Sequence, residues 1–142
     1  MNVDSLTAAE VMNRNVKTLS RSSKLKELMR FLMENHISGV PVVDEQSKFV
    51  GVVSTTDVLR RITLQIALKE EFASTDLAEV IDKTIESIIS RPLFNFKETD
   101  RIKDIAKVMM EKGIHRVFIV DGGNNLKGVI SAMDFVKLVG KS

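Results

Sequence analysis

Apolar residues in this chain follow two different periods, one typical of helices and one typical of strands. Residues 25–33 carry Leu and Met at helical spacing, which predicts an amphipathic helix ending at Asn35 or His36. Two β-branched runs follow, at residues 39–43 and 49–53, and the polar residues between them predict a hairpin with a long loop. The first third of the chain therefore predicts a mixed α and β structure.

The same order of elements returns 77 residues later. Short strands are predicted at residues 16–19 and 93–96, and the helical stripe returns at residues 102–110. A second hairpin is predicted from residues 117–120 and 126–131. Identical residues at this offset include Arg14/Arg91, Met33/Met110, Glu34/Glu111, Ile37/Ile114, Val40/Val117, Val43/Val120, Asp44/Asp121, Gly51/Gly128, Val52/Val129, Ser54/Ser131 and Asp57/Asp134. The chain is an internal duplication, and two halves with one open apolar face each are expected to bury those faces against each other.

The most informative repeated stretch is Gly-Val-Val-Ser-Thr-Thr-Asp-Val at residues 51–58, which returns as Gly-Val-Ile-Ser-Ala-Met-Asp-Phe at residues 128–135. Each copy predicts a strand that runs into Ser-x-x-Asp and then a helix. A carboxylate at such a turn can accept hydrogen bonds from both hydroxyls of a cis-diol, and the first N–H groups of the helix favour an anion. The turn is thus suited to a sugar phosphate.

Ser-x-x-Asp before an apolar run is also a capping box, with the serine as N-cap and the aspartate three residues on. A single copy would favour this capping role. Two copies at matched ends of matched hairpins favour ribose binding for at least one of them.

A long helical stretch separates the two halves. Residues 57–72 carry two apolar stripes, one with Leu59, Ile62 and Ile66 and one with Leu64, Leu68 and Phe72. One stripe serves the core of this chain, and the second needs another surface. A partner subunit and the next helix, predicted after the cap at residues 74–76 and continuing to Ile88, are equally good candidates.

Composition narrows the function classes. The chain has 142 residues, 44% hydrophobic and 28% charged, which suits one compact soluble domain or two small halves with a shared core. A net charge of +2 gives little attraction to nucleic acid or membranes, and without Trp or Tyr there is no stacking platform for bases. No stretch approaches the roughly 20 apolar residues of a membrane span, and no signal peptide is evident, so a cytoplasmic protein is expected.

The sequence gives little indication of a catalytic site or a metal site. The chain has no cysteine, and its two histidines, His36 and His115, cannot form a zinc cluster alone, so no metal is expected. His115 lies beside Arg116, but no nucleophile or paired carboxylate accompanies them at an informative spacing. We therefore do not expect an enzyme.

The tandem units resemble the cystathionine beta-synthase (CBS) domain family. The resemblance rests on residues 36–44 and 51–58 in the first copy and on 113–121 and 128–134 in the second, and it extends from about Thr7 to about Leu138. It implies an α+β fold of two βαββα repeats packed about a pseudo-twofold axis through their sheets, a Bateman module. The implied boundaries are residues 7–62 for repeat 1, 63–85 for a helical connector and 86–140 for repeat 2.

The resemblance also implies a ligand. Clefts between the repeats of that family bind adenosine-containing ligands such as AMP, ADP, ATP or S-adenosylmethionine, as regulators rather than obligatory cofactors. Ribose binding is implied for Asp57 and Asp134. Contact with phosphate or sugar is implied for Ser54, Thr55, Thr56, Ser131, His115 and Arg116. An adenine pocket is implied at Val16, Thr18, Ile37, Pro41, Leu93, Asn95, Ile114 and Phe118.

The two copies are not equivalent. The second has His115-Arg116 where the first has Ser38-Gly39, and it has Phe118 in place of Pro41. We therefore expect one good site and one weak or empty site.

The expected function is a non-catalytic regulatory module that signals to an unknown effector protein by a conformational or dimer change, as a homodimer. The alternative is a structural or dimerisation pair with no nucleotide ligand, in which Ser-x-x-Asp only caps helices.

Overall fold

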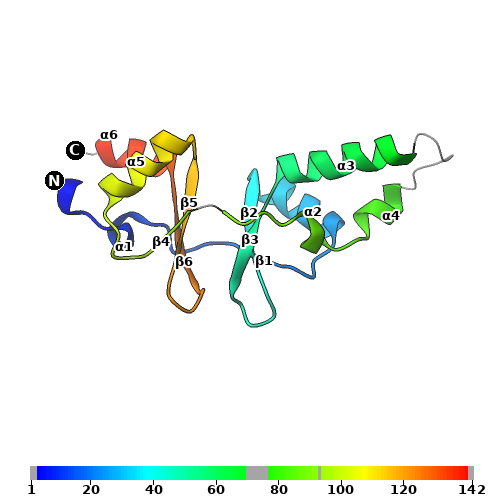
Figure 1. The fold of residues 1–142 in the computed structure, drawn as a ribbon, viewed down its shortest axis with the longest axis horizontal. Helices are drawn as coiled ribbons and strands as arrows, with labels where there is room; N and C mark the ends of the chain where they lie inside the picture. Colours follow the sequence, from blue (N-terminus) through cyan, green and yellow to red (C-terminus); the bar gives the residue numbers. More distant parts are fainter. Residues whose placement is uncertain (1–2, 70–76, 93, 141–142) are drawn as a thin grey trace. The chain divides into compact units, whose positions relative to one another are not determined.

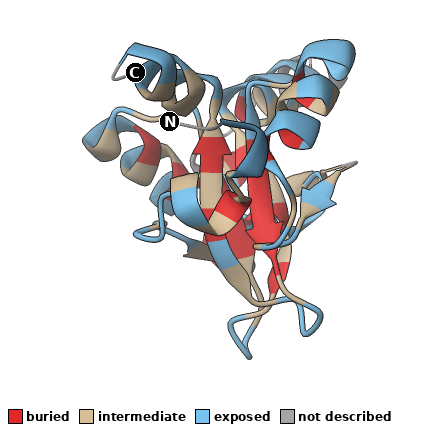
Figure 2. Ribbon diagram, turned by 90° about the vertical axis from the view of Figure 1, so that its left-hand side faces the viewer, coloured by how far each residue is buried: buried red, intermediate tan, exposed pale blue. Residues whose placement is uncertain are grey.

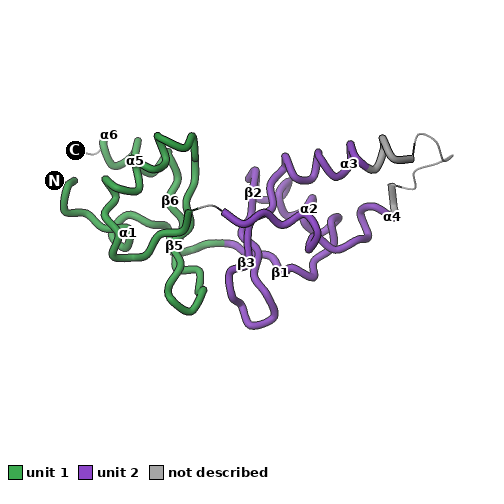
Figure 3. Tube along the Cα trace, in the orientation of Figure 1, with its two compact units in different colours: residues 1–16, 93–142 green, residues 17–92 purple. Residues whose placement is uncertain are grey.

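A computed structural model of the chain describes residues 3–69, 77–92 and 94–140. They form two compact units, Lys17–Pro92 and Met1–Val16 with Leu93–Ser142 (Figure 3). Each unit contains one three-stranded sheet, and helices cover a face of it (Figure 1). This arrangement confirms the predicted α+β class and the two repeated units.

The unit Lys17–Pro92 has the strand order β1-β2-β3. β1 runs parallel to β2, and β2 and β3 form the predicted antiparallel hairpin. Helix α2 ends at His36, whose left-handed backbone (φ 52°) stops the helix. The elements are β1 (Leu19–Ser20), α2 (Leu25–Asn35), β2 (Gly39–Val43), β3 (Phe49–Ser54), α3 (Thr55–Lys69), α4 (Leu77–Ile81) and the 3-10 helix η2 (Ile85–Ile88).

The other unit repeats this plan with the strand order β4-β5-β6. Its hairpin pairs Arg116 with Ser131, the counterpart of Gly39 with Ser54, and the irregularity between Val42 and Val43 returns at the same offset. The duplication therefore extends to strand register. The elements are η1 (Val3–Ser5), α1 (Ala8–Val11), β4 (Asn95–Phe96), α5 (Ile102–Lys112), β5 (Arg116–Val120), β6 (Leu126–Ser131) and α6 (Ala132–Gly140).

Three local predictions were wrong in detail. The strand predicted at residues 16–19 is displaced to β1, which shares only Leu19 with it, because only Leu19 and Ser20 pair with β2. Of the strand predicted at residues 93–96, Asn95 and Phe96 form β4 and Leu93 lies outside the described residues. The helix predicted after residues 74–76 breaks between α4 and η2, because the chain there pairs with the segment before α2: the N–H of Leu25 donates to the carbonyl of Lys83 (2.8 Å) and the N–H of Ile85 to the carbonyl of Ser23 (2.9 Å).

Pro41 lies in β2, the middle strand, although a residue without an N–H is normally confined to edge strands or bulges. The proline interrupts no ladder on the β1 side, because β1 pairs only with Val42 and Val43.

Each unit has its own apolar core, in which the buried residues concentrate in the strands and on the helix faces that cover them (Figure 2). The core of unit Lys17–Pro92 comprises Leu25, Leu28, Leu32, Val40, Val42, Val53, Val58, Val80 and Ile85. The core of the other unit comprises Ala8, Met12, Ile105, Met109, Val117, Ile119 and Ile130. Ala8 and Ile85, 77 residues apart, are both fully buried, so segments outside the hairpins complete each core.

The outer edges of β3 and β6 are covered in the same way. Val52 exchanges two backbone hydrogen bonds with Ser90 (2.8 and 2.9 Å), and Val129 exchanges two with Asn13 (2.9 and 3.0 Å). Ser90 belongs to the second repeat yet lies in the unit Lys17–Pro92, whereas Asn13 belongs to the first repeat yet lies in the other unit. Each unit thus contains the leading segment of the other repeat.

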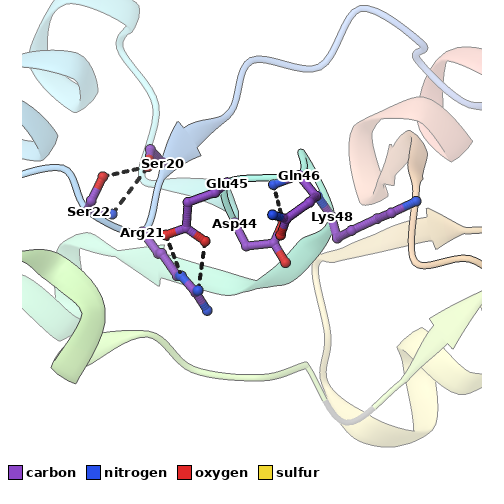
Figure 4. Close-up of polar contacts among 7 residues, drawn as sticks. All are labelled: Ser20, Arg21, Ser22, Asp44, Glu45, Gln46 and Lys48. Atoms are coloured by element: carbon purple, nitrogen blue, oxygen red, sulfur yellow. Dashed lines mark hydrogen bonds and ion pairs between the residues drawn. The ribbon is translucent and has the colours of Figure 1, made fainter.

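The loops of the two hairpins are closed by equivalent aspartates. Asp44 accepts hydrogen bonds from the N–H groups of Gln46 and Lys48 (both 2.9 Å), which lower the pKa of Asp44, the Lys48 N–H most strongly (Figure 4). Asp121 accepts from the N–H groups of Asn125 (3.0 Å) and Gly123 (2.9 Å), and the bonds from Asn125 lower the pKa of Asp121 most. Local polar contacts therefore fix both turns.

Beside the first loop, Arg21 binds both carboxylate oxygens of Glu45 at 3.1 and 2.7 Å (Figure 4). This hydrogen-bonded pair lowers the pKa of Glu45. The second repeat has Glu98 and Gly122 at the corresponding positions, so the pair belongs to the first repeat alone.

None of the helices within the described ranges 3–69, 77–92 and 94–140 combines the length and the hydropathy that a membrane span requires.

Candidate functional site

The first Ser-x-x-Asp turn joins β3 to α3. The N–H and the hydroxyl of Ser54 both donate to Oδ2 of Asp57 (2.8 Å each), and the N–H of Asp57 donates back to the Ser54 hydroxyl (3.3 Å). This reciprocal pattern is a complete capping box. Thr55 and Thr56 are the first two residues of α3, and both are exposed.

The second turn, between β6 and α6, has the same geometry. The N–H and the hydroxyl of Ser131 donate to Oδ2 of Asp134 at 2.7 and 3.1 Å, and the N–H of Asp134 donates to the Ser131 hydroxyl at 3.3 Å. Capping is therefore formed in both copies. It occupies one carboxylate oxygen of each aspartate and leaves the other oxygen for a different role.

The helix N-termini are less available to an anion than the sequence suggested. The first helical N–H group, that of Thr55 or Ala132, donates to the carbonyl of Ser38 (2.8 Å) or His115 (2.9 Å). The third donates to the capping serine. Backbone donors of these two turns are therefore largely satisfied within the fold, and phosphate binding would depend on side chains.

The outer oxygens of the two aspartates differ. Oδ1 of Asp57 lies 3.4 Å from Nη1 of Arg60 and 3.4 Å from the hydroxyl of Ser90. Oδ1 of Asp134 has no hydrogen-bond partner in the part of the chain that the structure describes. Both contacts to Asp57 are long for hydrogen bonds, so they hold this oxygen weakly.

A cavity of about 270 Å³ lies beside Asp57 within the unit Lys17–Pro92. Arg60 and Arg61 line it from α3, and Ser87 and Ser90 line it from η2 and the residues after it. Leu64, Ile88 and Ile89 complete the wall.

The sequence alone does not reveal this cavity, because adjacent arginines on a helix are typical of a solvated face. The spacing of Asp57 and Arg60, three residues apart on one helix, was the available signal. No sequence signal indicates that Ser87 and Ser90 also line the cavity, because both lie some thirty residues farther along the chain.

Arg116 is the first residue of β5, and His115 directly precedes this strand. Arg116 is the cross-strand partner of Ser131, so the fold brings the basic pair close to the Ser131–Asp134 turn. Both side chains are exposed, and neither bonds to Asp134 among the contacts of the described residues. His115 instead lines an apolar groove between α5 and α6.

The residues predicted around adenine have varied surroundings. Pro41 and Phe118 are buried, Val16, Ile37 and Ile114 are half-buried, and Thr18 and Asn95 are exposed. Asn95 and Phe118 are neighbours across β4 and β5, whereas Ile114 lines the groove between α5 and α6. Leu93 lies outside the described residues. The adenine pocket therefore stays a prediction.

Equivalent apolar grooves lie between the paired helices of each unit. The groove between α5 and α6 has a volume of about 410 Å³, and the one between α2 and α3 about 170 Å³. Met33 and Met110, offset partners at the groove rims, are 74% and 82% exposed. Of the stripe predicted to need a second surface, Leu64 is exposed, and the side chains of Leu68 and Phe72 lie outside the described residues.

Over the described residues, no three His, Asp or Glu side chains gather in a way that could hold a metal ion. Each turn thus offers a carboxylate held by its capping box together with hydroxyls, and arginines lie near each turn. These are groups that bind a sugar and an anion without a metal.

Known proteins share this fold and this sequence pattern. Protein MJ1225 of Methanocaldococcus jannaschii is 29% identical over 131 residues, which cover 92% of this chain and 42% of that protein, so the chain spans less than half of that relative. The structure of MJ1225 has a TM-score of 0.85 at 25% identity and covers 96% of this chain and 48% of that one.

Two structures with bound ligands also match. That of CBSX2 in complex with AMP has a TM-score of 0.78 at 20% identity, covering 96% and 97% of the two chains. That of the CBS domain pair of MJ0100 in complex with 5′-methylthioadenosine and S-adenosyl-L-methionine has a TM-score of 0.71 at 23% identity, covering 95% and 96%. The pattern of the CBS domain matches residues 8–64 and again residues 85–141, and the chain therefore belongs to the CBS domain family as a tandem pair.

Proposed function

We propose that this chain is a non-catalytic regulatory module that binds an adenosine-containing ligand through its Ser-x-x-Asp turns. The observation that carries the proposal is the state of Asp134. Its Oδ2 is fixed by Ser131, while its Oδ1 has no partner among the described residues. A carboxylate held in place with one free oxygen is preorganised to accept hydrogen bonds from ribose hydroxyls.

The relatives support the class of ligand. CBSX2 was crystallised with AMP, and the MJ0100 pair with 5′-methylthioadenosine and S-adenosyl-L-methionine. These molecules share the adenosine group and differ in charge, so the fold alone does not select among AMP, ADP, ATP and S-adenosylmethionine.

We propose that ligand binding changes the conformation or dimer geometry of the module and thereby signals to an effector protein. Such signalling requires the ligand to bind one state of the module more tightly than the other.

Calorimetric titration of the wild-type chain with AMP, ATP and S-adenosylmethionine tests this proposal. Asp134→Asn is expected to weaken binding of the preferred ligand at least about tenfold, because a neutral amide is a poorer partner for two hydroxyls. Asp104→Asn, which neutralises an exposed carboxylate of α5, is the matched control and should bind the ligand like the wild type. Absence of binding of all three ligands to the wild-type chain, or unchanged binding in both Asp134→Asn and Asp57→Asn, would contradict ribose binding.

A second candidate function is a structural or dimerisation pair without a ligand, and the complete capping boxes favour it. In that case Ser131→Ala and Asp134→Asn would lower stability to a similar extent, each by about 0.5–2 kcal/mol, with no ligand effect. Thermal unfolding of both variants with and without ATP separates the two functions.

We also propose that the helical faces associate with a second copy of the chain. Of the exposed large apolar side chains in the described ranges, all but Val3 lie on α2, α3, α5 or α6. Because both units carry such a face, a second copy related by twofold symmetry would present matching surfaces.

Sedimentation at micromolar concentration tests the association. The wild-type chain is expected to sediment as a dimer and Met110→Glu as a monomer. Val3→Glu, which changes an exposed apolar residue outside these helices, is the control and should remain dimeric. A monomeric wild-type chain would refute the dimer.

A further inference from the structure

The cavity beside Asp57 contains a set of groups that capping does not explain. Two arginines, Arg60 and Arg61, and two serines, Ser87 and Ser90, line a space of about 270 Å³ that Asp57 also lines. With two positive charges and one negative charge, its lining has a net positive charge. Guanidinium groups and hydroxyls are the side-chain donors that recognise phosphate oxygens.

The donors differ in how firmly they are held. Ser90 is fixed to β3 by its two backbone hydrogen bonds with Val52. Arg60, by contrast, has a side chain that is 71% exposed, and its contact with Asp57 is a long one at 3.4 Å. A solvent-exposed ion pair of this kind contributes little to stability, so Arg60 can leave the carboxylate at small cost. Ribose hydroxyls could then take Oδ1 of Asp57 while Arg60 turns to an anion.

The volume of the cavity sets what it can hold. Pockets for whole drug-sized ligands measure about 300–1,000 Å³, so a space of about 270 Å³ suits part of a nucleotide rather than all of it. A ribose phosphate, with the adenine bound elsewhere, matches both the size and the mixed acidic and basic lining.

The second repeat does not have the two arginines and two serines that line this cavity. The residues 77 positions from Arg60, Arg61, Ser87 and Ser90 are Lys137, Leu138, Glu10 and Asn13. One arginine is thus replaced by an apolar residue and one serine by a carboxylate that repels phosphate. The sequence had placed the phosphate contact partly at His115 and Arg116, whereas the cavity lies in the unit of the first repeat.

We propose that Arg60, Arg61, Ser87 and Ser90 bind the phosphate group of a nucleotide whose ribose is held by Asp57, an inference that rests on the proposed adenosine binding. The first repeat is then the phosphate-selective one. Arg60 acts as a counter-ion of Asp57 in the empty site and as a phosphate ligand in the occupied one.

Titration of the full chain with ADP and with adenosine tests the inference. Arg60→Ala is expected to weaken ADP binding about tenfold or more, the loss of one charge-assisted hydrogen bond, and to change adenosine binding less than about twofold. Arg60→Lys should recover part of the affinity, because it keeps the charge but not the fork of donors. Arg30→Ala, which removes an exposed arginine of α2 that does not line the cavity, is the control and should bind ADP like the wild type.

Two results would overturn the inference separately from the proposed function. If the wild-type chain binds ADP and adenosine but the Arg60→Ala/Arg61→Ala double variant binds ADP unchanged, the phosphate lies elsewhere and the cavity is not its site. If the wild-type chain binds no adenosine compound, titration with inorganic pyrophosphate decides: binding that the double variant loses supports an anion site in this cavity, and no binding refutes it.

Discussion

Gly51 and Gly128 occupy the same position in the two repeats, yet alanine is expected to destabilise the protein more at Gly51. A Cβ added to Gly51 would lie 2.5 Å from Cγ2 of Ile89 and 2.6 Å from the carbonyl oxygen of Ser90. That carbonyl accepts the 2.8 Å hydrogen bond from Val52, so the backbone bridge itself would have to move.

The cost can be worked from these contacts. Overpacking costs about 1–3 kcal/mol, and loss of each of the two bridging hydrogen bonds adds about 0.5–1.5 kcal/mol, so Gly51→Ala should lower the free energy of unfolding by about 2–6 kcal/mol. At Gly128 the nearest atoms are Sδ and Cγ of Met12, at 2.7 and 2.8 Å, with the carbonyl of Asn13 at 3.0 Å. A methionine side chain can adopt another rotamer, so about 1–2 kcal/mol is expected there.

Thermal unfolding of both variants measures the difference. At roughly 2–4 °C per kcal/mol, Gly51→Ala should lower the Tm by roughly 10 °C and Gly128→Ala by roughly 4 °C. Gly140→Ala is the control, since an added Cβ meets no atom within 4 Å there and alanine favours a helix over glycine, so its Tm should not fall. Equal losses at Gly51 and Gly128, or a larger loss at Gly128, would refute the reasoning.

Three further predictions concern the core, the loops and a surface ion pair. Met12→Ala should cost about 2–4 kcal/mol and speed hydrogen exchange in β6 more than in β3, because Met12 packs in the core of the unit that contains β6; equal effects on both strands would contradict this assignment. The pKa values of Asp44 and Asp121 are lowered, so the stabilisation they give the loops is complete above their unfolded-state pKa near 4 and is lost as the pH falls through the lower folded-state pKa values; loop amide exchange that stays constant on acidification would count against it. Arg21→Ala removes an exposed ion pair and should leave the Tm within experimental error, whereas a clear drop would assign it an unexpected structural role.

The hairpins and helices could be predicted because their signals are local. The β-branched runs and the 77-residue offset predict β2, β3, β5 and β6 within a residue or two. The break between α4 and η2 could not be predicted in this way, since it depends on pairing of residues 83 and 85 with the segment before α2. Long-range backbone pairing of this kind leaves no periodic pattern in the sequence.

The site shows the same division between local and distant contacts. Ser54 and Asp57 are three residues apart, so both their capping geometry and their position at a turn follow from the sequence. Ser90 reaches Asp57 across 33 positions, and this contact becomes visible only when the leading segment of the second repeat is seen against β3. For the same reason, the sequence alone does not place Arg60 and Arg61 in a cavity with Ser90.

Each compact unit contains the first segment of the other repeat, with Ser90 against β3 and Asn13 against β6, so the chain cannot be divided cleanly between the repeats. A fragment cut at the repeat boundaries would leave β3 without Ser90, or β6 without Asn13, and so would have one bare strand edge. Bare edges pair with other chains, so such fragments are expected to aggregate. A piece consisting of residues 17–92 keeps its own edge strand covered, because this compact unit combines segments of both repeats instead of coinciding with one.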